Sequence, residues 1–374
     1  MTLLAQASAR PRQRQRQRRS GLGSVDQPGS LKDVEFAPNP GSLRMRIHTP
    51  RDLPQGAPLV VVLHGCTQTG QGYASAAGWL TLADRFGFAV LCPEQTRTNN
   101  FNLCFNWYEP GDAARDGGEA ASIAAMVKRA VTDHDLDERR VFVTGLSAGG
   151  AMTAVVLATW PELFAGGAVI AGLPYGSAKS LPEAFAAMRQ AQAGTATVSG
   201  DSIRAATAHR GKWPPMSIWH GQDDTIVRPE AGEALARQWT ELHGIDGDPV
   251  AARTPAGRNF LVWLSDGEPV VELHRIPGMG HGVPLRTGGP DGSGTAGAHM
   301  FEVGISSSLE IALGWGIAEQ RLDLGQAPAG ETPPERSGPA GPGRARAASG
   351  PAVTVGDGIR EVIETALRAA GLMK

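Results

Sequence analysis

The sequence predicts an α/β protein with a mostly parallel β-sheet that is covered by helices on both faces. Several short apolar runs carry almost no polar side chains, as strands do when both faces of their sheet are buried. Stretches with apolar residues at helical spacing lie between these runs. Strands that alternate with helices favour a parallel sheet joined by right-handed crossovers. The apolar runs are residues 59–63, 88–92, 141–145 and 167–171.

The remaining elements follow from shorter patterns. Residues 43–48 alternate between apolar and polar side chains and predict an edge strand. Residues 121–130 and 229–242 have helical periodicity, and the second stretch starts with a proline, which suits the first turn of a helix. Residues 216–221 and 270–276 are strand-like, and each runs into a loop rich in polar residues or glycine.

Composition excludes several classes of protein. The 374 residues suffice for one large domain with appendages, and the hydrophobic content of 41% is ordinary for a globular protein. The formal net charge of −2 argues against nucleic acid as a partner. No apolar run approaches the roughly 18 residues of a transmembrane helix. Three cysteines are too few for a disulfide-based scaffold.

Both ends of the chain are predicted to extend beyond a catalytic domain at residues 41–322. Residues 1–40 contain an arginine-rich run and predict a disordered, flexible basic arm, or an arm that adheres to an anionic surface. The residues after the arginines are not apolar enough for a secretory signal. We therefore expect a cytoplasmic location and regard an extracellular one as less favoured.

The C-terminal region is predicted to be a tethered helix. Residues 323–350 are rich in proline, glycine and alanine and form the expected linker. Residues 351–374 contain an amphipathic stripe, which must bury its apolar face either on the protein's own body or on a partner such as a hydrophobic particle. The stripe is formed by Ile359, Val362, Ile363, Ala366 and Leu367.

Residues 174–214 interrupt the alternation of strands and helices. The stretch is rich in alanine, serine and glycine and lies between two predicted strands. Insertions at the carboxyl edge of such a sheet cover the site there, so a partial lid is the functional interpretation. A surface excursion without a role at the site is the alternative.

A serine follows one of the buried strands at a sharp turn. Gly145-Leu146-Ser147-Ala148-Gly149 comes after an apolar run and before a small, apolar stretch, which gives the order strand, turn, helix. A serine on such a turn presents its hydroxyl at the edge of the sheet, and flanking glycines let neighbouring backbones pass close to it. The pentapeptide alone is a weak signal, but its context makes Ser147 a candidate nucleophile.

Three further segments complete a catalytic constellation. The strand at 59–63 leads to Cys66, whose backbone N–H is a candidate oxyanion-hole donor together with that of Ala148. An acid follows the strand at 216–221, and His281 lies on a glycine-rich loop after a later strand. The chain order serine, acid, histidine is that of α/β-hydrolases.

Several segments in order resemble the poly(3-hydroxybutyrate) depolymerase family of esterases, which are relatives of feruloyl and acetylxylan esterases. The resemblance covers about residues 40–320. It implies an α/β-hydrolase fold, hydrolysis of ester bonds and a Ser-Asp-His triad. The segments that carry it are residues 63–69, 93–95, 104–112, 145–152, 277–282 and 301–308.

The resemblance assigns roles to individual residues. It implies that Ser147 is the nucleophile, Asp224 the acid and His281 the base. The family pattern His-Gly, two residues, Asp, two residues, Val selects Asp224 over Asp223. It also implies a disulfide between the cysteines at positions 66 and 104.

Two aromatic residues are candidates for substrate binding. Trp107 is a candidate wall for an apolar substrate chain, and a plain core tryptophan is its alternative; Tyr175 is the second candidate. His64 and His220 each precede a glycine at a strand end and are interpreted as structural.

The sequence therefore predicts a serine esterase that hydrolyses polyhydroxyalkanoate, such as poly-3-hydroxybutyrate, or its oligomers. The first alternative is a carbohydrate esterase of the feruloyl or acetylxylan type. The second is a granule- or surface-binding protein in which the hydrolase core is secondary. No cofactor is expected, and no metal, because no cluster has the ligand spacing of a metal hydrolase.

Overall fold

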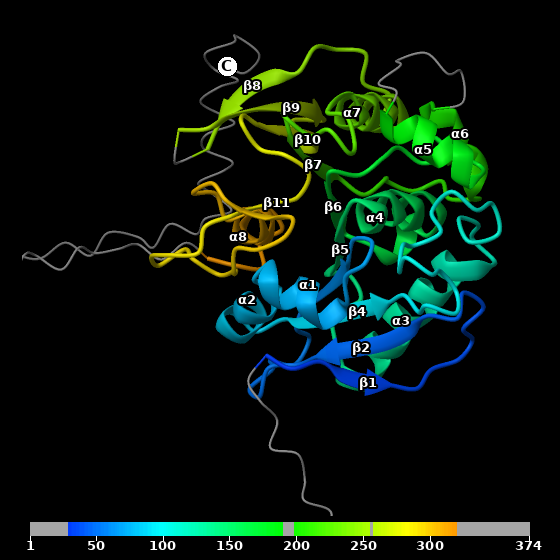
Figure 1. The fold of residues 1–374 in the computed structure, drawn as a ribbon, viewed down its shortest axis with the longest axis vertical. Helices are drawn as coiled ribbons and strands as arrows, with labels where there is room; N and C mark the ends of the chain where they lie inside the picture. The colour runs from blue at the N-terminus through cyan, green and yellow to red at the C-terminus, as the bar shows by residue number, and fades with distance from the viewer. Residues whose placement is uncertain (1–28, 190–197, 255–256, 320–374) are drawn as a thin grey trace, which may run out of the picture.

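The computed structural model describes residues 29–189, 198–254 and 257–319. A ten-stranded sheet runs through these residues in the order β1-β2-β4-β3-β5-β6-β7-β10-β9-β8 (Figure 1). The central strands β4, β3, β5, β6, β7 and β10 are parallel, and the two strands at each edge are antiparallel to their neighbours. The strands are β1 Lys32–Val34, β2 Arg44–His48, β3 Leu59–Leu63, β4 Ala89–Glu94, β5 Val141–Leu146, β6 Gly166–Ile170, β7 Met216–Gly221, β8 Val250–Arg253, β9 Asn259–Ser265 and β10 Glu268–Ile276.

Helices cover both faces of this sheet. Helices α1, α2 and α8 pack with one apolar core on one face, and α3, α4, α6 and α7 pack with a second core on the other (Figure 1). The predicted α/β architecture is therefore confirmed. The helices are α1 Gly70–Ala76, α2 Trp79–Phe86, α3 Gly118–His134, α4 Ala148–Thr159, α5 Leu181–Arg189, α6 Gly200–Ala206, α7 Glu230–Leu242 and α8 Ser307–Gly314, with a 3₁₀ turn at Pro161–Leu163.

The predicted buried strands and helices lie where the apolar pattern indicated. Every residue of β3, β4, β5 and β6 is buried, as expected for strands with a helical layer on each side. The helix predicted at 121–130 is the middle of the longer α3, and the one predicted from residue 229 is α7. The boundaries differ by a few residues because local patterns fix element ends poorly.

The prediction of a disordered arm is wrong for residues 29–40. Strand β1 pairs with β2, with Lys32 opposite Ile47 and Val34 opposite Met45. A three-residue strand with two charged side chains has no periodicity to detect, so only its pairing partner reveals it. Residues 1–28, the linker at 323–350 and the predicted helix at 351–374 lie outside the described residues. Predictions about them stay predictions.

The segment at 174–214 contains α5 and α6. Helix α6 packs against α7 and α4. The end of α5 contacts the chain after β7, where the N–H of Arg228 donates to the carbonyl of Met188 at 3.0 Å. The segment thus lies beside the loop that carries Asp224, and its function as a lid stays a prediction.

Two small β-structures were not predicted from the sequence. One is the antiparallel pair of β8 and β9, which extends the sheet beyond β10. The other is a parallel pair, β11 (Val283–Leu285) and β12 (Met300–Glu302), which forms a separate two-stranded sheet just after His281. Among the described residues, no helix has the length and apolar character needed to cross a membrane.

Candidate active site

The candidate site residues gather at one edge of the sheet. Strands β3, β5, β7 and β10 run parallel, so their carboxyl ends lie at the same edge. Cys66 follows β3, Ser147 follows β5, Asp224 follows β7 and His281 follows β10. Ligands of open α/β sheets bind outside the carboxyl ends of the strands, so this edge is the expected site.

Ser147 sits on a strained turn between β5 and α4. Its backbone has φ 58° and ψ −118°, in the left-handed half of conformational space that side chains rarely adopt. Its N–H donates to the carbonyl of Ile170 at 2.9 Å. The turn also requires glycine, because a Cβ at Gly145 would lie 2.4 Å from the carbonyl oxygen of Gly149. The hydroxyl is thereby presented at the edge of the sheet.

Asp224 and His281 form a buried pair. The Nδ1 atom of His281 lies 2.7 Å from Oδ2 of Asp224, and Oδ1 accepts the N–H groups of Ile226 and Val227 at 2.9 Å each. Burial alone would raise the pKa of Asp224, but hydrogen bonds from His220 and His281 outweigh it and hold this pKa well below its usual range. Asp224 is therefore ionised and fixed in orientation.

The neighbouring aspartate has a different role. Asp223 is exposed, and its N–H donates to the carbonyl of Met279 at 3.0 Å. This bond ties the loop after β7 to the loop that carries His281. Asp224, which is 1% exposed, is the one whose carboxylate contacts the histidine.

Backbone contacts hold the histidine loop from the other side. The carbonyl of His281 accepts a hydrogen bond from Nδ1 of His299 at 2.8 Å, and the N–H of Val283 donates to the carbonyl of His299 at 2.9 Å. No hydrogen bond joins Ser147 to His281 within the described part of the chain. Such bonds are often long without substrate and shorten when it binds.

The N–H groups of Cys66 and Ala148 are available at this edge. Leu63 of β3 pairs with Gly145 of β5, which places the loop after β3 beside the serine turn. Ala148 opens α4, and the first N–H groups of a helix have no partner within it. In the described residues neither amide donates a backbone hydrogen bond. Two free donors beside a serine can stabilise an oxyanion.

A disulfide and a polar network support the loop after β3. Cys66 is bonded to Cys104, as the family resemblance implied. The carbonyl of Cys104 accepts from Nε2 of Gln95 at 2.9 Å, and the N–H of Gln95 donates to Nε2 of His64 at 3.1 Å. These contacts connect the loop after β3, which carries Cys66, to the segment that follows β4.

Glu119 is the centre of that network and was not identified from the sequence. Its carboxylate accepts four hydrogen bonds of 2.6–3.0 Å, from Nε2 of Gln95, Nδ2 of Asn99, and both the backbone N–H and Nδ2 of Asn106. Burial raises the pKa of Glu119 to about 8, and the nearby charge of Asp112 adds to this effect. A glutamate in the first turn of a predicted helix gives no sign of such burial.

The two candidate substrate-binding aromatics differ in placement. Trp107 is 6% exposed and packs edge-to-face against Tyr108 within the core, which favours the core alternative. Tyr175 is partly buried, and its backbone N–H and carbonyl bond the side chain of Gln238 at 3.0 and 2.8 Å. Its role in binding stays a prediction.

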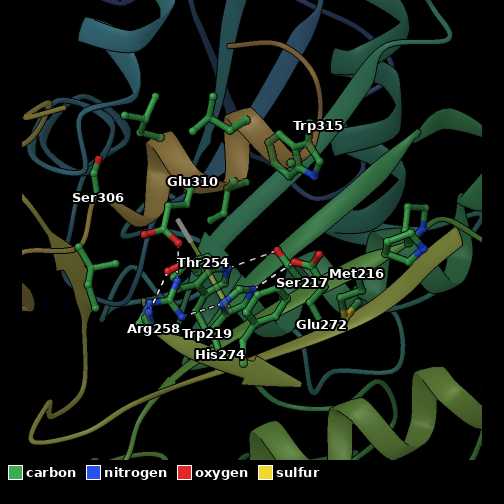
Figure 2. A pocket seen from close by; sticks show the side chains of 18 of the residues that line it. Met216, Ser217, Trp219, Thr254, Arg258, Glu272, His274, Ser306, Glu310 and Trp315 are labelled. Atoms are coloured by element: carbon green, nitrogen blue, oxygen red, sulfur yellow. Dashed lines mark hydrogen bonds and ion pairs between the residues drawn. The ribbon is translucent and has the colours of Figure 1, made fainter. Parts of the chain in front are cut away.

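A cavity lies away from the candidate catalytic edge. It has a volume of about 540 Å³ and opens between α8 and the strands β7, β9 and β10 (Figure 2). Three rings from adjacent strands stack on its wall, with centroids 3.9 Å apart for Trp219 and His274 and 4.6 Å apart for His274 and Phe260. Residues of β7 up to Trp219 and of β10 up to His274 line it, whereas the candidate catalytic residues Asp224 and His281 lie on the loops after these strands and do not line it.

His274 is held in one tautomer in this cavity. Arg258 can only donate, so Nδ1 of His274, 2.9 Å from the guanidinium, accepts. Its Nε2–H therefore faces the carboxylate of Glu272 at 3.1 Å. This histidine belongs to a structural stack rather than to the catalytic edge.

No group of three or more histidine, cysteine, aspartate or glutamate side chains is arranged to hold a metal ion within residues 29–189, 198–254 and 257–319. The catalytic edge instead offers a hydroxyl, an imidazole, a carboxylate and two amide donors. This set can carry out nucleophilic acyl transfer.

A serine on a strained turn after a parallel strand, with an acid and a histidine on the loops after later strands of the same sheet, defines the α/β-hydrolase class. A solved acetyl xylan esterase from Aspergillus awamori has the same fold, with a TM-score of 0.65 and 27% identity over 78% of this chain and 100% of that one.

The chain belongs to the esterase PHB depolymerase family, whose model matches residues 49–260. It is 45% identical over 285 residues to poly(3-hydroxyalkanoate) depolymerase C of Paucimonas lemoignei, which covers 75% of this chain and 69% of that protein. It is 33% identical over 256 residues to an acetylxylan esterase of Coprinopsis cinerea, which covers 67% and 68%. The chain is thus a carboxylic ester hydrolase.

We expect Glu119→Ala to lower the free energy of unfolding by roughly 2–4 kcal/mol, because four buried donors lose their acceptor. Unfolding in urea measures this loss, and turnover of a soluble ester should fall with it. The exposed Glu109 of the same segment offers a matched control, Glu109→Ala, which should change neither quantity. Equal stability of the two variants would contradict the structural role of the network.

We expect the stabilising contribution of the ionised Asp224 to be lost in acid. Its folded pKa lies below that of an unfolded aspartate, about 3.9, so its contribution is complete above that pH and is lost as the pH falls. The difference in melting temperature between wild type and Asp224→Asn should therefore stay constant above about pH 5 and should narrow progressively as the pH falls below about 4. The exposed Asp223 provides the control, since Asp223→Asn should follow wild type throughout. A gap between wild type and Asp224→Asn that does not change with pH would refute this.

Proposed function

We propose that this chain is a serine esterase that hydrolyses polyhydroxyalkanoate or its oligomers. The observation that carries the substrate class is the 45% identity to a poly(3-hydroxyalkanoate) depolymerase over three quarters of the chain. The buried Asp224–His281 pair at the same edge as Ser147 supports the chemistry.

The proposed reaction is a two-step acyl transfer. His281 takes the proton of Ser147, whose oxygen attacks the ester carbonyl, and the N–H groups of Cys66 and Ala148 hold the oxyanion. His281 then protonates the departing alcohol, which leaves an acyl-serine. Water, deprotonated by His281, attacks this acyl group and releases the hydroxy acid. Asp224 keeps the imidazole in the productive tautomer and stabilises its charged form.

The carbohydrate-ester alternative has weaker support. The acetylxylan esterase of Coprinopsis cinerea is 33% identical, against 45% for the depolymerase. The non-enzymatic alternative is set aside by the membership of the family. Substrate choice between the two ester classes is therefore the main object of the first experiment.

The purified protein should hydrolyse amorphous polyhydroxybutyrate and its soluble trimer faster than acetylated or feruloylated xylan. Release of hydroxybutyrate, acetate and ferulate measures the three activities under one condition. Ser147→Ala and His281→Ala should each lose about 10³-fold or more in kcat, with losses that do not add, because the residues act as a unit. Faster release of acetate or ferulate would favour the alternative.

The acid is assigned by a matched pair of variants. Asp224→Asn should lower kcat by about 10³–10⁴-fold, since the amide favours the wrong tautomer of the histidine. Asp223→Asn should retain activity. The reverse result would assign the acid to Asp223.

We also propose that residues 351–374 attach the enzyme to a polyester particle. Burial of each apolar side chain of the stripe predicted there would lower the free energy of the bound state by roughly 1.5–3 kcal/mol. Once this helix is bound, the linker would keep the catalytic domain close to the particle and so raise the effective concentration of its substrate.

Deletion of residues 351–374 should weaken hydrolysis of polymer granules several-fold but spare a small soluble ester. Rates on both substrates, together with the melting temperature, measure the effect. A loss of both activities with a lower melting temperature would mean that the segment packs on the catalytic body.

The location in the cytoplasm stays a prediction, and the Cys66–Cys104 disulfide bears on it, because disulfides are rare in reducing compartments. Alkylation in intact cells distinguishes the cases. In a cytoplasmic chain both Cys66 and Cys104 should be reduced and therefore alkylated. The free energy of unfolding of this reduced protein should be about 2–4 kcal/mol lower than that of the oxidised protein. Labelling of only the buried Cys92, and only after unfolding, would place the chain in an oxidising compartment.

A further inference from the structure

A second histidine contacts the proposed catalytic acid. His220, the penultimate residue of β7, is 2% exposed and lies four residues before Asp224. Its Nε2 atom is 2.9 Å from the carbonyl oxygen of Val227 and 3.4 Å from Oδ2 of Asp224. Helix α7 leaves room for the ring, because a Cβ at Gly232 would lie 3.1 Å from its Nδ1 atom.

The surroundings of this ring define its protonation. Both neighbours of Nε2 are acceptors, a carbonyl and an ionised carboxylate, so Nε2 carries a hydrogen and donates. Its Nδ1 atom is buried and has no hydrogen-bond partner in the described residues. A second proton on Nδ1 would be a buried donor without an acceptor, which is costly. His220 therefore donates through Nε2.

The Nε2 atom of His220 is the fourth donor that faces the carboxylate of Asp224. Oδ1 accepts the N–H groups of Ile226 and Val227, and Oδ2 lies 2.7 Å from Nδ1 of His281 and 3.4 Å from Nε2 of His220, whose shorter contact is the carbonyl of Val227. An ionised carboxylate has about four lone-pair sites, and all four face a donor here. The two histidines thus share one carboxylate oxygen.

We propose that His220 is a positioning residue that orients Asp224 and limits how strongly its charge acts on His281. With His220 present, part of the charge on Oδ2 is compensated by a second donor. Without it, the whole charge acts on His281, which then binds its proton more tightly, and the carboxylate loses one of its anchors. The inference rests on the proposed triad.

Few other titratable groups face this pair. His299, from the segment before β12, stands edge-on to His281 with ring centroids 5.7 Å apart and bonds its carbonyl through Nδ1. Asp223 contacts the histidine loop through its backbone N–H alone. The variants below leave both groups unchanged, so a change in pH dependence comes from position 220.

The test compares His220→Gln, His220→Leu and His220→Asn. The amide nitrogen of glutamine can occupy the position of Nε2 and donate to Oδ2, whereas leucine has no donor and asparagine is too short to reach. We expect His220→Leu to lower kcat about 10-fold with little change in KM, and to move the acid limb of the kcat/KM profile about half a pH unit upward. His220→Gln should remain close to wild type in both respects.

A matched control is His274→Gln, which changes a buried histidine on the adjacent strand β10 that does not contact Asp224 (Figure 2). It should alter stability but leave the acid limb in place. If His220→Leu does not fold, His220→Asn should show the same shift. Superimposable pH profiles for His220→Gln and His220→Asn would overturn the proposal, and so would an equal shift in His274→Gln. Failure of the triad itself would appear instead as an active Ser147→Ala.

Discussion

The serine turn and the end of β3 touch through backbone alone. A Cβ at Gly149 would lie 2.2 Å from the carbonyl oxygen of Leu63 and 2.5 Å from that of His64, so only glycine permits the approach. This contact places the loop after β3, and with it the N–H of Cys66, next to the serine. A larger residue at position 149 would push the loop that carries Cys66, a candidate oxyanion donor, away from the candidate nucleophile Ser147.

Further contacts hold the loops around the serine turn in place. The disulfide and the Glu119 network fix the loop after β3, and the loops after β7 and β10 are bonded to each other at Asp223 and Met279. Gly221 packs equally tightly, since a Cβ there would lie 2.2 Å from the carbonyl oxygen of Met279. Preorganised donors and charges of this kind need no rearrangement when charge develops, which is the main source of catalytic power in such sites.

The sequence predicted the parts of the fold that depend on local pattern. Apolar runs identified β3 to β6, and the turn around Ser147 identified the catalytic edge, because strain and glycine leave a signature over five residues. Strand β1 and the β8–β9 pair escaped prediction because β1 and β8 have only three and four residues, and many side chains of these strands are exposed or half-buried. The same holds within the site. Glu119 is buried against Gln95, Asn99 and Asn106, and its neighbours in the chain do not reveal these contacts. The sequence identified His220 as structural, but its proximity to Asp224 is visible only in the structure.

The two edge strands of the sheet, β1 and β8, have features that disfavour pairing with strands of another molecule. A long, flat edge strand exposes unpaired N–H and carbonyl groups that can pair with another molecule. Here β1 is three residues long and carries Lys32 and Asp33, with the Asp33 carboxylate bound by Arg46 of the next strand, and β8 is four residues long and ends in Arg253. Short, charged margins of this type protect against edge-to-edge aggregation. Wherever many copies of the protein crowd together, such margins keep neighbouring molecules from joining into a continuous sheet.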